Sequence, residues 1–228
     1  MKKILVIGIC ALFLIGSQPN IYKAKNIKVE TAPQKLTVSS LVTKDSMSLA
    51  DNKDLQVALL DADLLPQNII GKLHREHYTI KLQPNLIQLS GNKLAIAHGI
   101  CDYKTHMLTI ANYVLPAGIS KTKDILFTQA DELNLLHEIG HMWAWNKESG
   151  VNYSTASKFE NIRLRESRML FQTNVFKDDY DNYLAYYGGY NDEYYAECFA
   201  LYFESSESNQ ILKVNAPLTY KYIMETTK

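Results

Sequence analysis

Residues 135–143 contain the pattern H-E-x-x-H, with histidines at positions 137 and 141. Residues four apart on an α-helix leave the same face about one turn apart, so His137 and His141 would present two ring nitrogens to one small cation. Zn²⁺ binds such nitrogens at roughly 2.0–2.1 Å, and a catalytic zinc has three protein ligands and a fourth position for water. Glu138 follows the first histidine, where it could take a proton from that water as general base. The pattern therefore predicts one catalytic zinc ion.

The neighbouring residues favour a helix at this position. Thr128 is a candidate N-cap with Asp131 three residues on, and the segment from there to Asn146 holds no proline and one glycine. Apolar residues flank the histidines at helical spacing: Leu133, Leu136, Ile139, Gly140 and Trp143. Such a stripe indicates a helix buried beside a cleft.

The N-terminus predicts export. Lys2 and Lys3 precede an apolar run of 12 residues at 4–15, which is too short to span a bilayer. We interpret residues 1–24 as a signal peptide, cleaved after Ser17 or Ala24, and expect a secreted, extracellular protein without stable membrane association. Residues 25–228 are enough for one domain with a sizeable core, which we expect to be monomeric.

The charge balance and the cysteine content give no support for a nucleic-acid-binding protein or for a fold held by several disulfides. The 24 basic and 24 acidic side chains balance, so nothing in the composition favours nucleic acid or an anionic membrane as a partner. Only Cys101 and Cys198 lie beyond the signal peptide. One disulfide between them is possible, but Cys198 lies in an expected active-site helix and is favoured as a buried thiol. A core, and not crosslinks, must hold the fold.

The segments before the histidine helix predict an α+β fold. Residues 26–51 are polar and are interpreted as a loosely held N-terminal arm. Residues 55–74 have helical spacing, with a restart at Pro66 as a first-turn proline. Strands are predicted at 78–82, 94–98 and 107–113, the last two flanking a turn between 102 and 105. We expect a helix on a small antiparallel or mixed sheet whose last strand precedes the zinc helix.

The remaining histidines and arginines give weaker signals. His74 and His77 near a helix end, and the isolated His98 and His106, are not assigned to a metal. Residues 151–171 are predicted to form a surface helix. Its arginines are interpreted as a solvated face: Arg163, Arg165 and Arg168.

A third zinc ligand must come from elsewhere in the chain. The extended metalloprotease signature would place a histidine at position 147, but that residue is lysine. Three glutamates fall broadly on one face of a helix expected from residue 191 onward: Glu193, Glu197 and Glu204. Spacing alone does not choose among them.

Residues 137–141 and 193–199 together resemble the catalytic domain of anthrax lethal factor and the related secreted Pro-Pro endopeptidases. Those proteins carry H-E-x-G-H and then E-x-F-A-E-x-F, and here Tyr195 replaces the first Phe. The resemblance implies a zincin-like α+β fold in which Glu193, on a second helix, is the third zinc ligand. It also implies that Glu197 supports the site by accepting the other N–H of a ligating imidazole.

The same resemblance implies a tyrosine hydroxyl over the zinc, in a setting similar to Y-x-x-x-N. Tyr187 and Asn191 fit that spacing, although Asn191 to Glu193 is one residue shorter than the family pattern. Tyr186 and Tyr190 therefore remain alternatives to Tyr187.

Taken together, the motifs predict a secreted zinc-dependent endopeptidase acting on extended segments of extracellular or surface proteins, near prolines by analogy with the family. The substrate would add as a strand to an edge formed by residues 107–113. Aromatic residues are candidate substrate contacts by location only: Tyr103, Tyr113 and Trp143. The alternatives are a toxin-like protease acting on a host protein and a non-enzymatic, zinc-stabilised binding protein. Glu138 argues against the last, because a structural site has no use for a base there.

Overall fold

Two helices precede the sheet, as the break at Pro66 predicts. In the computed structural model, α1 is Lys53–Ala62 and α2 is Gln67–Arg75. Pro66 is the N-cap of α2, with an extended ψ of 140°, and so stands one position before the first turn. The structure describes residues 35–43, 53–83, 86–90, 93–97, 99–111, 132–146, 150–173, 184–185 and 187–228. The expected signal peptide lies outside these residues.

The main sheet is mixed and has three strands. Its order is β1-β5-β4, where β1 is Thr79–Gln83, β5 is Met107–Ala111 and β4 is Gly99–Asp102. Strand β1 runs parallel to β5, whereas β4 runs antiparallel to it, with Cys101 opposite Leu108. A separate antiparallel hairpin joins β2 (Leu86–Ser90) to β3 (Lys93–Ala97).

This pairing corrects the expected sheet edge. The sequence predicts that the segment at 107–113 is the edge to which a substrate adds, but β5 is the central strand, paired on both sides. The reason is that β3 pairs with β2, while the short strand β4 takes the place beside β5. Strand β4 is therefore an edge of the three-stranded sheet.

Part of the expected N-terminal arm is docked on the domain. Residues 35–228 form one compact unit, and within it Val38 is fully buried just before the short 3₁₀ helix Ser39–Leu41. Asp63 accepts hydrogen bonds from the backbone N–H groups of Val38 and Ser39. Val42 then forms a parallel bridge to Ile80 beside β1. A carboxylate cap and a buried valine thus hold residues that composition alone marks as loose.

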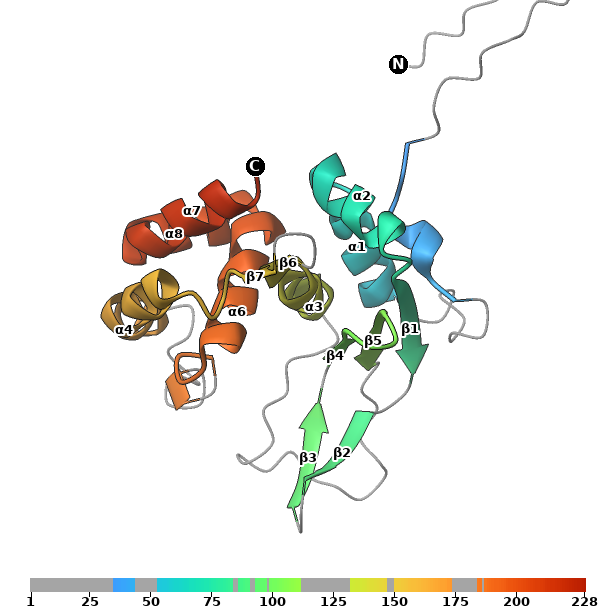
Figure 1. Cartoon of the computed structure of the whole chain (residues 1–228), viewed down its shortest axis with the longest axis horizontal. Coiled ribbons are helices and arrows are strands. Elements are labelled where there is room, and N and C mark those ends of the chain that lie inside the picture. The colour runs from blue at the N-terminus through green and yellow to red at the C-terminus, as the bar shows by residue number, and fades with distance from the viewer. Residues whose placement is uncertain are drawn as a thin grey trace, which may run out of the picture. The chain divides into compact units, whose positions relative to one another are not determined.

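The helix with the H-E-x-x-H pattern is α3 (Glu132–Ala144), and it lies beside α6 (Asn191–Glu204) (Figure 1). A Cβ at Gly140 would lie 2.9 Å from the Cα of Ala196, so only glycine allows the two helices to approach this closely. The candidate N-cap at Thr128 lies outside the described residues. After α3, the two-residue strands β6 (Trp145–Asn146) and β7 (Val151–Asn152) form an antiparallel pair.

Three further helices pack around α6: α4 (Ser157–Phe171), α7 (Ser206–Asn215) and α8 (Pro217–Thr226). Buried Glu166 on α4 accepts hydrogen bonds from the N–H groups of Leu218 and Thr219 and so caps α8, whose own N-cap has no side-chain bond. Aromatic rings fill the space between these helices: Phe159, Phe171, Tyr194, Tyr195 and Tyr222. No helix in the described part of the chain has the length and apolar character needed to cross a bilayer.

Candidate active site

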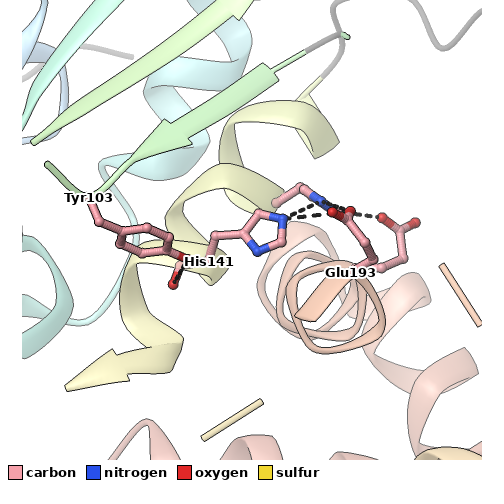
Figure 2. A network of polar contacts seen from close by, with 5 residues as sticks. Tyr103, His141 and Glu193 are labelled. Atoms are coloured by element: carbon pink, nitrogen blue, oxygen red, sulfur yellow. Dashed lines mark hydrogen bonds and ion pairs between the residues drawn. The ribbon is translucent and has the colours of Figure 1, made fainter. Parts of the chain in front are cut away.

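Side chains from α3 and α6 converge on one point. The Nε2 atoms of His137 and His141 are 3.1 Å apart. The Oε2 atom of Glu193, in the first turn of α6, lies 3.2 Å from the first of these nitrogens and 3.6 Å from the second. Figure 2 shows His141 and Glu193 turned toward each other from the two helices. Among the described residues, no other group of three His, Cys, Asp or Glu side chains converges in this way.

These distances fit a tetrahedral metal. Ligands at 2.0–2.1 Å from a tetrahedral zinc are about 3.3 Å from one another, which matches the three observed separations. Two imidazoles and one carboxylate are also a ligand set that catalytic zinc sites use. The residues present therefore fit one Zn²⁺, with the fourth position left to water.

The three glutamates, which helical spacing does not distinguish, differ in their distance from the histidines. Glu193 joins the two histidines directly, whereas Glu197, one turn further along α6 and 1% exposed, lies 3.1 Å from the Nδ1 of His137 through its Oε2. A carboxylate at that nitrogen holds the imidazole in the tautomer that leaves Nε2 free for a metal. Glu204, at the end of α6, is outside this group.

Without a bound metal, the site favours a protonated His137 and an ionised Glu193. Burial opposes the protonated form of His137 and lowers its pKa, but hydrogen bonds to Glu193 and Glu197 outweigh burial and raise the pKa to about 10. Burial also raises the pKa of Glu193, but its hydrogen bonds to His137 and His141 outweigh that effect and hold the pKa well below its usual value. In the absence of metal, a proton on His137 therefore compensates the carboxylates.

Glu138 is buried beside these ligands at 6% exposure. Burial raises the pKa of its carboxyl group, and the nearby His141 and His137 offset that rise only in part. A Cβ at Gly99 on β4 would lie 2.6 Å from the Cγ of Glu138, so the absence of a side chain at position 99 gives Glu138 its space. This close approach also brings the edge strand β4 next to Glu138.

Of the two candidate tyrosines that the structure describes, Tyr187 lies at the site. Its ring centroid is 5.5 Å from that of His137, in an edge-to-face arrangement. Tyr190 is 60% exposed at the N-cap of α6, and Tyr186 lies outside the described residues. Tyr187 is therefore the described candidate whose ring lies against a histidine of the His137, His141 and Glu193 group.

Two side chains hold the end of α3: Tyr103, which was a candidate substrate contact by location, and Lys72, which no motif indicated. The Tyr103 hydroxyl, from the turn after β4, donates to the carbonyl oxygen of His141 at 3.1 Å (Figure 2). Buried Lys72 on α2 donates from Nζ to the carbonyl oxygens of Met142, at 3.0 Å, and Trp145. A cation at a helix C-terminus is favoured by the helix dipole. One feature of the sequence indicates that Lys72 is buried: it lies three residues after Ile69 and so on the apolar face of its helix.

Two other predictions can be placed. Cys198 is a buried free thiol, as expected, and Cys101 is free as well. Trp143 packs against the core and donates from Nε1 to the carbonyl oxygen of Thr226 at 3.0 Å, so packing is its role here. Tyr113 lies outside the described residues.

Comparison with known proteins agrees with the two motifs. The family described as "Anthrax toxin lethal factor, N- and C-terminal domain" matches residues 17–226. Among solved structures, that of the Pro-Pro endopeptidase PPEP-2 from Paenibacillus alvei is similar, with a TM-score of 0.51 and 17% sequence identity over 84% of this chain and 99% of that chain. At that identity the likeness shows a common fold. No curated protein sequence matches. Because the family match spans nearly the whole chain, including both site helices, this protein belongs to the anthrax toxin lethal factor family.

Proposed function

We propose that this protein is a secreted, zinc-dependent endopeptidase that hydrolyses peptide bonds in extended segments of extracellular or surface proteins. One observation carries the proposal: ligand atoms of His137, His141 and Glu193 converge at the spacing of a tetrahedral face. Family membership supports peptidase chemistry at this site. A buried carboxylate beside the ligands, Glu138, supplies the base that hydrolysis needs.

Each side chain has a separate role. Zn²⁺ bound at the three ligands would polarise the scissile carbonyl and lower the pKa of a water molecule. Glu138 takes a proton from the attacking water and passes it to the nitrogen of the leaving amine. The raised pKa of Glu138 suits both transfers. A carboxyl group whose pKa lies closer to the working pH can both accept and release a proton. Tyr187 donates a hydrogen bond to the carbonyl oxygen as negative charge develops there.

We propose that the substrate adds as a strand to β4. The outer edge of β4 has no strand partner among the described residues, and Gly99 on this strand approaches Glu138 closely. A peptide paired with that edge would gain backbone hydrogen bonds and carry its scissile bond past Glu138. The similar solved structure is named a Pro-Pro endopeptidase. We therefore propose that proline-containing segments are preferred, because proline favours the extended conformation that a sheet edge accepts.

Metal analysis and peptide cleavage test the roles at the zinc site. Glu138→Gln should keep one zinc per chain and lose activity by about 100-fold or more, because only the base is removed. His141→Ala should lose the zinc itself. A Glu138→Gln protein that cleaves peptides at the parental rate would refute the role of the base.

Zinc titration separates Glu193 from Glu197. Loss of a supporting carboxylate typically lowers metal affinity by about 10- to 100-fold, so Glu197→Ala should lose about that much. Glu193→Ala should lose more, because it removes a ligand. The reverse order would make Glu197 the third ligand.

A peptide library tests the substrate preference. Peptides with randomised residues on both sides of the scissile bond should be cleaved most efficiently when proline lies near that bond. Efficient cleavage without enrichment of proline would remove the proline preference and leave the endopeptidase proposal intact.

A further inference from the structure

One of the arginines predicted to be solvent-exposed instead binds the loop that carries Tyr187. Arg165 and Arg168 on α4 are exposed, but Arg163 is half-buried and turned toward residues 187–191. Its Nη1 donates to the carbonyl oxygen of Gly188 at 2.6 Å, and its Nε donates to the Oδ1 of Asn191 at 2.5 Å. One guanidinium therefore binds both sides of a single turn.

The two acceptors lie between the tyrosine and the third ligand. The Gly188 carbonyl belongs to the residue that directly follows Tyr187. Asn191 is the first residue of α6, the helix that holds Glu193. The turn itself is tight, since a Cβ at Gly188 would lie 2.7 Å from the carbonyl oxygen of Leu184. The Arg163 guanidinium thus connects the backbone at Tyr187 to the start of the ligand helix.

Helix stabilisation does not account for a cation at this position. Arg163 approaches the N-terminus of α6, where the helix dipole favours negative charge. The first turn of α6 already has Asp192 and Glu193 to satisfy that preference. Arginine instead supplies two N–H donors held in one rigid plane, an arrangement that a lysine ammonium lacks.

We propose that Arg163 is a positioning residue for Tyr187: by clamping the turn 187–191, it fixes the tyrosine hydroxyl relative to the metal ligands. This inference rests on the proposed function of the site. It also gives Asn191 a role, as the acceptor that anchors the far end of the turn. A displacement of about 1 Å in a group that acts on the transition state lowers the rate by up to about 100-fold.

A double-mutant cycle tests the proposal. Arg163→Met should lower kcat by about 10- to 100-fold with KM within about threefold, because Tyr187 acts on the transition state. In a Tyr187→Phe background, the same substitution should lower kcat by less than about threefold, because the group it positions is already gone. Arg165→Met, on the same helix with the same change of charge, is the matched control and should leave kcat unchanged. An equal loss in both backgrounds, or no loss at all, would overturn the proposal.

Hydrogen exchange of the zinc-loaded protein gives a readout that does not depend on activity. Peptides covering residues 184–193 should exchange faster in Arg163→Met and in Asn191→Ala than in the parent or in Arg165→Met. Arg163→Lys keeps the charge without the two planar donors and should behave like Arg163→Met. If exchange in this segment is unchanged, Arg163 does not hold the turn. A parent protein that binds zinc but cleaves no peptide would instead refute the proposed function and leave the exchange result to stand by itself.

Discussion

Gly140 permits the close contact between α3 and α6 on which the metal ligands depend, and Gly140→Ala should weaken zinc binding. The added Cβ would lie 2.9 Å from the Cα and 3.1 Å from the carbonyl oxygen of Ala196. Carbon atoms pack at about 3.5–4.0 Å, so the first contact is short by about 0.6–1.1 Å. Both contacted atoms belong to the backbone and cannot rotate away. The helices must therefore separate or tilt by an amount of that order.

Such a shift matters because Gly140 directly precedes His141 and Ala196 lies about one turn after Glu193. Metal ligands must keep their distances within about 0.2 Å, and Glu193 reaches the histidines only across this helix contact. We expect the zinc affinity of Gly140→Ala to fall by about 10- to 100-fold. Zinc would then stabilise the variant by about 1.4–2.7 kcal/mol less than it stabilises the parent. The free energy of unfolding of the metal-free protein should fall by a separate amount of about 0–3 kcal/mol, since overpacking costs about 1–3 kcal/mol and alanine regains up to about 1 kcal/mol of helix propensity.

Competition titration with a chromophoric chelator measures the affinity, and urea unfolding with and without zinc measures the stability. Gly71→Ala is the matched control, because Gly71 is also a buried helical glycine but its added Cβ would meet only the end of the Arg75 side chain at 3.2 Å. This variant should bind zinc like the parent. Parental zinc affinity in Gly140→Ala would refute the reasoning.

Three further results are expected. Gly99→Ala should keep zinc but lower kcat/KM by about 10- to 100-fold in peptide assays, because its Cβ would occupy the space of the Glu138 side chain; unchanged kinetics would contradict this. Lys72→Met should lower the free energy of unfolding in urea by about 2–4 kcal/mol, since buried carbonyls at the end of α3 lose a charged donor; a loss below about 0.5 kcal/mol would not fit. At pH 7 the metal-free His137 carries a proton, because its pKa is raised to about 10. Zinc must displace that proton, so apparent affinity should rise about tenfold per pH unit above pH 7, and calorimetry in buffers of different ionisation enthalpy should detect one released proton.

Local patterns predicted the parts of the site that lie on single helices. The pair His137 and His141 needs only a helical period, and the break at Pro66 needs only the geometry of proline. The choice of Glu193 was different in kind. Three glutamates share one face of α6, and which of them meets the histidines depends on how α6 crosses α3. The spacing of residues within either helix does not reveal that crossing. The family resemblance supplied that information.

Patterns failed where the partner of a residue is distant in sequence. Helical spacing gives Arg163 an exposed position, but it contains no information about the turn 25 residues later that covers it. The same limit applies to β4, whose four residues pair with β5 only because β3 finds its partner in β2. Val38 lies in a polar segment and is buried because Asp63 binds the backbone around it. In each case a tertiary contact overrides local composition.

The proposed metal ligands and the proposed oxyanion tyrosine are held by different contacts, so zinc binding and catalysis should be separable by mutation. His137, His141 and Glu193 depend on the packing of α3 against α6, where Gly140 sets the separation. Tyr187 lies in a turn before α6, and Arg163 clamps that turn from α4. A change at Gly140 should therefore act first on zinc affinity, whereas a change at Arg163 should act on kcat while zinc remains bound. If both substitutions shifted affinity and kcat together, the turn and the two helices would have to move as one rigid element, and the separate roles given to Gly140 and Arg163 would be wrong.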